Sequence, residues 1–208
     1  MNALPTNLAL MPNRTIVPPT VQMMLNEIGP CPVEALMLGM CDDHQPAFIN
    51  LNQEDYPFFV SAPAGWGKTH LLKTTLEFAR KMKSNHEISP VVLTDHRDEW
   101  MDMANLVRVE YLNDDTLRTI LQATENFGKA GRYRYALVLI DGWDSADHAM
   151  RDSFLSQMAK RRRVCTIIAS RTETCFRCVV PIRQGYRPGQ FQTIEKDIPL
   201  FFYVPSLE

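Results

Sequence analysis

Residues 62–69 read Ala-Pro-Ala-Gly-Trp-Gly-Lys-Thr, and they join an apolar run at 56–61 to an amphipathic stretch that starts at Lys68. The apolar run is predicted to be a buried strand, and the amphipathic stretch a helix. A glycine-containing loop between a strand and a helix lets backbone N–H groups turn towards an anion, and the helix adds the positive end of its dipole. The stretch therefore predicts a phosphate-binding P-loop.

The residues of this loop have distinct expected roles. Lys68 is expected to reach the β- and γ-phosphates of a nucleotide, and the Thr69 hydroxyl to bind Mg²⁺. Trp66 either shields the phosphates or packs on a neighbouring segment, and His70 has no assigned chemistry. Ala62 stands where the usual pattern has its first glycine. Alanine is tolerated at this position as long as the backbone does not need a positive φ. The alternative interpretation of residues 62–69 is a plain strand-to-helix turn that binds no phosphate. The nucleotide-binding candidates are Ala64, Gly65, Trp66, Gly67, Lys68, Thr69 and His70.

A second motif is the run Tyr-Ala-Leu-Val-Leu-Ile-Asp at 135–141. A continuous apolar run of this length is typical of a central parallel strand. Asp141 then lies at the carboxyl end of that strand, where open α/β sheets bind ligands. We interpret it as the Walker B aspartate that holds Mg²⁺, with a cap on the next turn as the alternative. Two motifs in this order predict a P-loop ATPase that uses ATP and Mg²⁺.

The residue after Asp141 departs from the usual pattern. Many P-loop ATPases place there a Glu that orients the attacking water, whereas this chain has Gly142. Asp144 is a candidate for the same catalytic role, or for capping a helix that begins near Ser145. The sequence thus predicts nucleotide binding and leaves hydrolysis open. If nothing else supplies the carboxylate, Gly142→Glu is expected to raise the hydrolysis rate.

The remaining chain alternates strands and helices. This order predicts an α/β, RecA/FtsK-like P-loop fold, with a mostly parallel sheet and helices on both faces. We divide the chain into a proline-rich N-terminal segment, 1–45, and a P-loop ATPase domain, 46–208. The expected strands include 47–51, 90–95, 135–141, 164–171, 191–193 and 200–203, and the expected helices 20–28, 68–83 and 146–161. A further helix is expected to start near 114, with Leu117, Ile120, Leu121 and Thr124 facing inward.

The composition indicates a cytoplasmic protein. Basic and acidic residues nearly balance, at 22 and 24 of 208, so any contact with nucleic acid has to be local. No apolar stretch approaches the roughly 20 residues of a membrane span, and the N-terminus lacks the order of a signal peptide. Five cysteines, an odd number, favour reduced thiols. Cys175 and Cys178 form a lone Cys-x-x-Cys, for which ordinary thiols are favoured over a metal site.

Several segments, in their order along the chain, resemble the FtsK–HerA superfamily of hexameric ATPase motors. The likeness runs from about residue 33 to the end. It rests on the lead-in at 38–51, the strand ending in Thr94-Asp95, the basic loop and following strand at 160–171, and the segments 187–192 and 201–205. The last two are similar to the tail of FtsK-like domains, including EssC-type modules of secretion motors. The chain departs from the family at Gly142 and at Arg171, where many members carry Gln.

The resemblance implies an oligomeric, ring-forming translocase that moves double-stranded DNA, or a protein substrate, with ATP. It also implies recruitment to a membrane-associated complex or to a capsid, as in small viral packaging ATPases. Two alternatives are a hydrolysis-poor module of a secretion or assembly complex and a loader or regulatory switch ATPase. The candidates for an arginine acting on a neighbouring subunit are Arg162, Arg163 and Arg171, with Arg97 and the 129–134 loop competing. Solvated surface charge, or charge that complements a helix dipole, is the alternative for these arginines.

Overall fold

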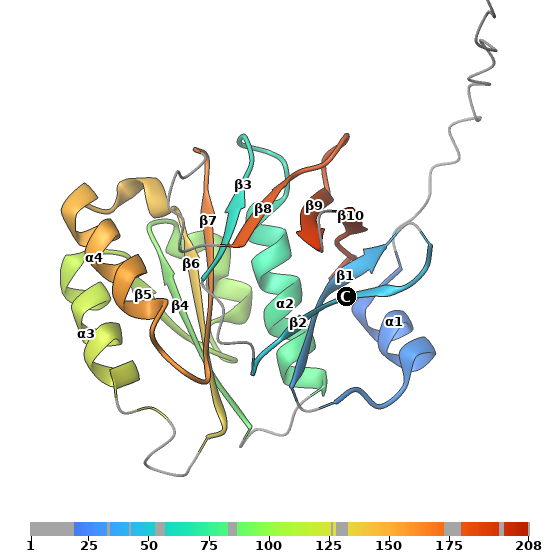
Figure 1. Ribbon diagram of the computed structural model, residues 1–208, viewed down its shortest axis with the longest axis horizontal. Helices are drawn as coiled ribbons and strands as arrows, with labels where there is room; N and C mark the ends of the chain where they lie inside the picture. The colour runs from blue at the N-terminus through green and yellow to red at the C-terminus, as the bar shows by residue number, and fades with distance from the viewer. Residues whose placement is uncertain are drawn as a thin grey trace, which may run out of the picture.

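A computed structural model describes residues 19–32, 34–41, 43–52, 57–82, 87–125, 127, 133–172, 180–195 and 198–207. Over these residues the chain forms one mixed sheet with helices on both faces, which confirms the predicted α/β fold class (Figure 1). Segment 1–18, the Cys-x-x-Cys motif at 175–178 and most of the 129–134 loop lie outside the described residues.

The helices and strands match most of the predicted positions. The helices are α1 (Val21–Ile28), α2 (Lys68–Met82), α3 (Asp114–Glu125) and α4 (His148–Met158), with 3-10 turns η1 (Arg97–Met103) and η2 (Trp143–Ser145). The strands are β1 (Ala35–Cys41), β2 (Pro46–Asn50), β3 (Phe58–Ser61), β4 (Ile88–Thr94), β5 (Arg108–Tyr111), β6 (Tyr135–Asp141), β7 (Val164–Ser170), β8 (Val180–Gln184), β9 (Gln190–Glu195) and β10 (Ile198–Tyr203). Strands β1, β5 and β8 were not among those predicted.

The order of the strands decides where the predicted motifs meet. In the described residues the order is β2-β1-β10-β9-β8-β3-β7-β6-β4-β5. The strands from β8 to β5 run parallel, and the pairs from β8 to β2 are antiparallel. Strand β3, which leads into the P-loop, is separated from β6 by β7. The carboxyl ends of these parallel strands therefore share one edge of the sheet.

Strand β6 shows why a continuous apolar run lies at the centre of this fold. Every residue of the strand is buried, and successive side chains point to opposite faces. Leu137 and Leu139 join the core cluster that contains the inner face of α2. Val138 and Ile140 pack instead in the cluster formed by α3 and α4. The helix positions predicted to face inward from α3 are buried, namely Leu117, Ile120, Leu121 and Thr124.

The N-terminal part of the described chain belongs to the same sheet. Helix α1 confirms the prediction for 20–28, and the Thr20 side chain caps it by accepting a hydrogen bond of 3.2 Å from the Met23 N–H. Strand β1 pairs with β2 and β10, so the predicted boundary between residues 45 and 46 falls between two paired strands. Among the described helices, none has the length and apolar character needed to cross a bilayer.

Candidate functional site

A cavity of about 700 Å³ opens at the edge of the sheet where the parallel strands end. Its lining combines the P-loop, the end of β6 and the end of β7 with the turn that follows β4. The cavity brings together most of the predicted site residues. They are Ala64, Gly65, Gly67, Lys68, Thr69, His70, Asp141, Asp144 and Arg171.

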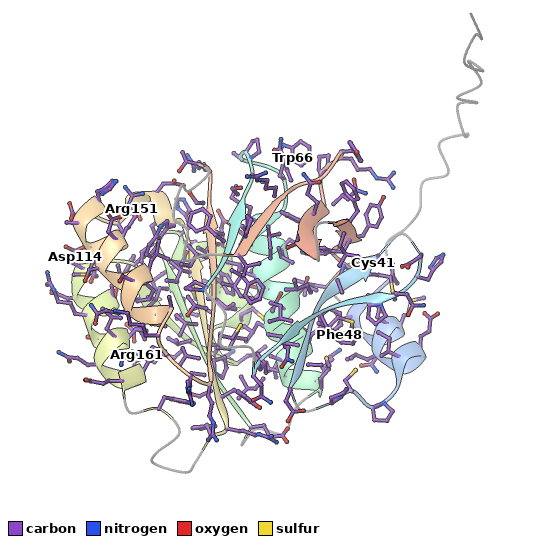
Figure 2. The ribbon with its side chains drawn as sticks, in the orientation of Figure 1. Cys41, Phe48, Trp66, Asp114, Arg151 and Arg161 are labelled. Carbon is purple, nitrogen blue, oxygen red and sulfur yellow. The ribbon has the colours of Figure 1, made fainter. Side chains whose placement is uncertain are left out.

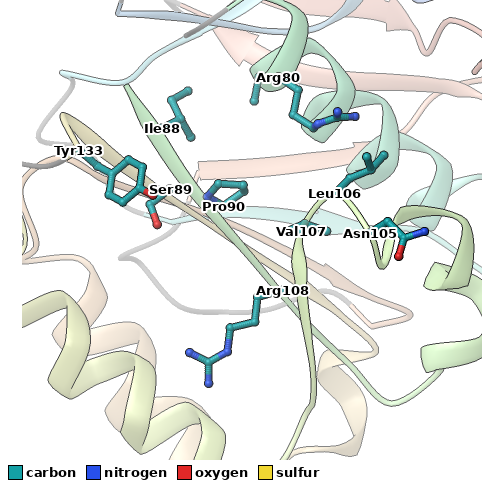
Figure 3. Close-up of a pocket in the computed structure, with 10 residues that line it drawn as sticks. Arg80, Ile88, Ser89, Pro90, Asn105, Leu106, Val107, Arg108 and Tyr133 are labelled. Carbon is teal, nitrogen blue, oxygen red and sulfur yellow. The ribbon is translucent and has the colours of Figure 1, made fainter. Parts of the chain in front are cut away.

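A second cavity, of about 410 Å³, lies between α2 and the amino-terminal ends of β4 and β5 (Figure 3). Its lining includes Arg80, Pro90, Leu106, Arg108 and Tyr133. None of the predicted nucleotide-binding residues lines it, so the candidate site is the cavity at the P-loop.

The P-loop backbone needs glycine at two positions. Gly65 and Gly67 have φ values of 79° and 88°, in the left-handed region that side chains disfavour. Ala62 is not among the described non-glycine residues with a positive φ, so alanine in place of the usual first glycine introduces no strain. The Ala62 N–H donates a hydrogen bond of 3.3 Å to the carbonyl of Ser170, which joins the start of the loop to the end of β7.

Lys68 lies at the centre of the loop. Its Nζ donates hydrogen bonds to the carbonyls of Ala62 at 2.6 Å and Pro63 at 2.9 Å. Burial lowers the pKa of Lys68, and although the Asp141 carboxylate opposes this shift, the charge of Arg171 adds to it. Two cations thus face one cavity from the P-loop and from the end of β7, an arrangement suited to a ligand with several negative charges.

Asp141 joins the P-loop to η1. Its side chain is 5% exposed, the Thr69 hydroxyl hydrogen-bonds to its carboxylate, and the Trp100 indole donates to its Oδ2 at 3.1 Å. Burial raises the pKa of Asp141, the two hydrogen bonds oppose that rise, and the charges of Glu99 and Asp95 reinforce it. A hydroxyl and a carboxylate side by side are the oxygen donors that Mg²⁺ prefers, so Thr69 and Asp141 fit the ion.

Asp144 connects η2 to the end of β7. Its carboxylate accepts hydrogen bonds from the Ser170 hydroxyl at 2.6 Å, the Arg171 N–H at 2.7 Å and the Thr172 hydroxyl at 2.9 Å. Burial raises the pKa of Asp144, but these hydrogen bonds outweigh that effect and hold the pKa below its usual value. Asp147, and not Asp144, caps α4 by accepting two backbone N–H bonds of its first turn, so the predicted capping role of Asp144 is wrong.

Asp144→Ala is expected to lower the free energy of unfolding by about 1–2 kcal/mol, because a partly exposed carboxylate with several hydrogen bonds is lost. The pKa of Asp144 in the folded protein lies below the ordinary value of an aspartate, so this stabilisation is complete above about pH 5 and is lost as pH falls through the folded pKa. Urea unfolding of both proteins at a series of pH values measures the difference. A gap that stays constant down to about pH 3 would contradict this assignment.

Two loop residues make structural contacts beside the cavity. Trp66, labelled in Figure 2, packs against the core cluster, and its carbonyl accepts a hydrogen bond of 3.2 Å from the Gly189 N–H. The His70 ring nitrogen Nε2 lies 2.7 Å from the carbonyl of Pro205. Both contacts hold the segment around β9 and β10 against the P-loop.

The candidate arginines lie at opposite ends of β7. Arg171 directly follows the carboxyl end of the strand and lines the same cavity as Lys68. Arg162 and Arg163 precede the amino end, so they lie at the other edge of the sheet. Arg97 stacks its guanidinium on the Tyr111 ring, at 5.0 Å from the ring centroid. A role of Arg162, Arg163 or Arg171 towards a neighbouring subunit stays a prediction.

The structure changes what is expected at Gly142. This residue has a φ of 90°, and a Cβ built on it would collide with Oδ1 of Asp95, from the turn after β4. The sequence suggested that Gly142→Glu would supply a missing carboxylate. Because a side chain at position 142 would be strained by the positive φ and would displace the Asp95 carboxylate, that substitution is now expected to damage the site. The contacts that Trp100 and Asp95 make at the end of β6 were not predicted from the sequence.

Comparison with known proteins identifies the fold. No protein-family model matches the sequence, and no curated protein matches it. Among solved structures, the chain is similar to EssC (ATPases 2 and 3) from Geobacillus thermodenitrificans, with a TM-score of 0.66 and 13% identity over 92% of this chain and 45% of that chain. It is also similar to the cytoplasmic domain of the type VII secretion ATPase EccC from Thermomonospora curvata, with a TM-score of 0.62 and 14% identity over 83% and 26% of the two chains.

A third similar structure is matched along its whole length. The genome packaging NTPase B204 of Sulfolobus turreted icosahedral virus 2, in complex with ATP-gammaS, has a TM-score of 0.50 and 12% identity, over 74% of this chain and 100% of that one. By contrast, the chain spans less than half of the EssC and EccC structures. At such identities the similarity shows the fold alone, which this chain shares with the domains of these three structures.

Proposed function

We propose that the chain binds Mg·ATP in the cavity at the P-loop. One observation carries this proposal: Lys68 and Thr69 of the P-loop meet Asp141 of β6 at the edge of a parallel sheet, in a cavity of about 700 Å³. The Lys68 ammonium would bind the β- and γ-phosphates, and Thr69 and Asp141 would hold Mg²⁺ through their side-chain oxygens. The N–H groups of the loop and the start of α2 would neutralise further phosphate charge.

We further propose that the chain acts as an ATPase of the FtsK–HerA kind, as one subunit of a ring that moves a polymer, with double-stranded DNA as the first candidate. The proposal is supported by the kinds of protein that share the fold, which are secretion ATPases and a genome packaging NTPase. A ring would let a subunit supply an arginine to its neighbour's nucleotide, and such an arginine can change the rate by several orders of magnitude. A membrane-associated complex or a capsid is the class of partner to which the ring would attach.

Steady-state hydrolysis, measured with and without double-stranded DNA and combined with sedimentation, tests this function. We expect turnover that DNA stimulates and an oligomer that forms with Mg·ATP. Tight ATP binding without turnover under any condition would instead indicate the hydrolysis-poor module of an assembly complex. Turnover that responds only to a protein partner, in a chain that stays monomeric, would indicate the loader or switch ATPase.

Asp141→Asn is expected to remove most of the Mg²⁺ dependence of ATP binding, because the substitution replaces a charged metal ligand with a neutral amide of the same shape. The Trp100 indole retains an oxygen to which it can donate, so the fold is expected to persist. Calorimetric titrations with ATP, in Mg²⁺ and in EDTA, measure the effect. Equal Mg²⁺ dependence in the variant and the parent would contradict the assignment. Asp102→Asn, at a carboxylate paired with Lys73 outside the cavity lining, is the control.

A further inference from the structure

The turn after β4 places a carboxylate beside Gly142, the position at which many P-loop ATPases carry a glutamate after the Walker B aspartate. Strand β4 pairs with β6 so that Thr94 lies opposite Asp141, and Asp95 therefore comes beside Gly142. The contact is so close that a Cβ on Gly142 would collide with the Asp95 carboxylate. The Asp95 side chain explains why residue 142 is a glycine. The space in front of the Gly142 Cα is already occupied by this acidic side chain, which comes from the turn after the neighbouring strand.

The Asp95 carboxylate has spare hydrogen-bonding capacity. It lines the cavity that contains Lys68, Thr69 and Asp141, and its side chain is 29% exposed. Its Oδ1 is buried and accepts no hydrogen bond from the described residues. The His96 Nε2 lies 3.5 Å from Oδ1, which is longer than the roughly 2.7–3.2 Å of a well-formed hydrogen bond. A buried oxygen without a hydrogen bond is costly, so its presence calls for an explanation, and a catalytic role is one such explanation.

The position of Asp95 is fixed by the residues around it. The His96 N–H donates to the Thr94 hydroxyl at 3.0 Å, which shapes the turn directly after the strand. The fully buried Trp100 anchors the following η1 turn to Asp141 through its indole N–H. Because both ends of the short segment are tied to β4 and β6, the carboxylate is held in place before any ligand binds, which favours a catalytic role.

Three other carboxylates line the cavity, of which Asp141 is the proposed Mg²⁺ ligand, and the other two are less suited to this role. Asp144 already accepts three hydrogen bonds from the end of β7, so its oxygens are occupied by structural contacts. Glu99 projects from the exposed side of η1, without the close backbone contact that fixes Asp95. Asp95 therefore has the rigid position that the role requires, and its side chain is partly exposed in the cavity.

We propose that Asp95 is the catalytic carboxylate that orients the attacking water, and that the chain consequently hydrolyses ATP without a glutamate at position 142. This inference rests on the proposed binding of Mg·ATP at the P-loop. The water oxygen forms a bond to the γ-phosphorus while the bond from that phosphorus to the β,γ-bridging oxygen breaks, and the bonding electrons leave with ADP. Asp95 takes the proton of the water and passes it to the released phosphate.

The test compares Asp95→Asn with the parent protein, in the full chain. Asp95→Asn is expected to lower kcat by about 100-fold or more while the affinity for Mg·ATP stays within about twofold, since the role is exercised in the transition state. Asp98→Asn removes the same charge from the same segment, outside the cavity lining, and is expected to keep the parent kcat. Expressing kcat per ATP-binding site, from the calorimetric stoichiometry, removes any misfolded fraction from the comparison. Asp95→Ala is measured in the same way, as a second variant of this residue.

Each outcome either supports or overturns the proposed role of Asp95. Loss of turnover in both Asp95 variants with ATP binding retained supports the proposal. Parent-like turnover in Asp95→Asn would overturn the proposal. If Glu99→Gln loses turnover while Asp95→Asn keeps it, Glu99 and not Asp95 has the catalytic role. A parent protein that binds Mg·ATP and does not hydrolyse it would also overturn the role of Asp95 and leave the binding function intact. A parent protein that fails to bind Mg·ATP would refute the proposed function and this inference with it.

Discussion

Lys68→Ala is expected to weaken Mg·ATP binding by about 10- to 150-fold, the equivalent of the roughly 1.5–3 kcal/mol of a charged hydrogen bond. The substitution removes the ammonium that faces the cavity, whereas the loop backbone and its glycines remain. The measurement is the rise in melting temperature that ATP produces, followed over a range of ATP concentrations, because a ligand that binds the folded state stabilises it by mass action.

A matched control separates the loss of this ammonium from the loss of charge in general. Lys81 lies in the last turn of the same helix, where it pairs with Glu77 at 3.6 Å. Lys81→Ala removes the same charge far from the P-loop and is expected to change ATP affinity by less than about twofold, as is usual for screened surface charges. Equal affinity in Lys68→Ala and the parent would refute the P-loop assignment.

Gly142→Glu is expected to abolish hydrolysis, the opposite of what the sequence suggested. A side chain at position 142 adds the strain of a positive φ, about 1–2 kcal/mol, and collides with the Asp95 carboxylate. Relief of the collision displaces the Asp95 carboxylate from the end of β6. Steady-state turnover measures the effect, and a rate above that of the parent would show that position 142 accepts the carboxylate after all.

A double-mutant cycle isolates the contact between Gly142 and Asp95. Gly142→Ala in the parent is expected to lower the free energy of unfolding by about 2–4 kcal/mol, the sum of backbone strain and overpacking. In an Asp95→Gly background the collision is gone, and the same substitution is expected to cost about 1–2 kcal/mol, for the strain alone. Equal costs in the two backgrounds, measured by urea unfolding, would mean that the two residues do not compete for the same space.

The sequence was sufficient to predict those features that one continuous segment determines. The P-loop combines a strand, a loop and a helix within one continuous stretch, and β6 is apolar along its full length because both of its faces are buried. For the same reason the inward-facing positions of α3 could be predicted from their spacing alone. These features do not depend on which distant segment becomes the neighbour.

The sequence was insufficient for short strands without a clear pattern and for contacts between strands. Strand β5 has four residues with no fully buried side chain, and β8 contains Pro181 and buries only Ile182 among its five residues, so neither shows a clear alternation. The hydrogen bond from Trp100 to Asp141 joins residues 41 positions apart, and it depends on β4 lying beside β6. The Asp95 carboxylate meets Gly142 for the same reason, so its role could not be read from local pattern.

The most direct test of nucleotide binding is a calorimetric titration of the unaltered chain with ATP-gammaS, in the presence of Mg²⁺ and again in EDTA. We expect one nucleotide site per chain, with binding that weakens markedly when EDTA removes the metal, because Thr69 and Asp141 would hold Mg²⁺ beside phosphates bound by Lys68. An absence of binding heat up to millimolar nucleotide, confirmed by an unchanged melting temperature, would contradict it.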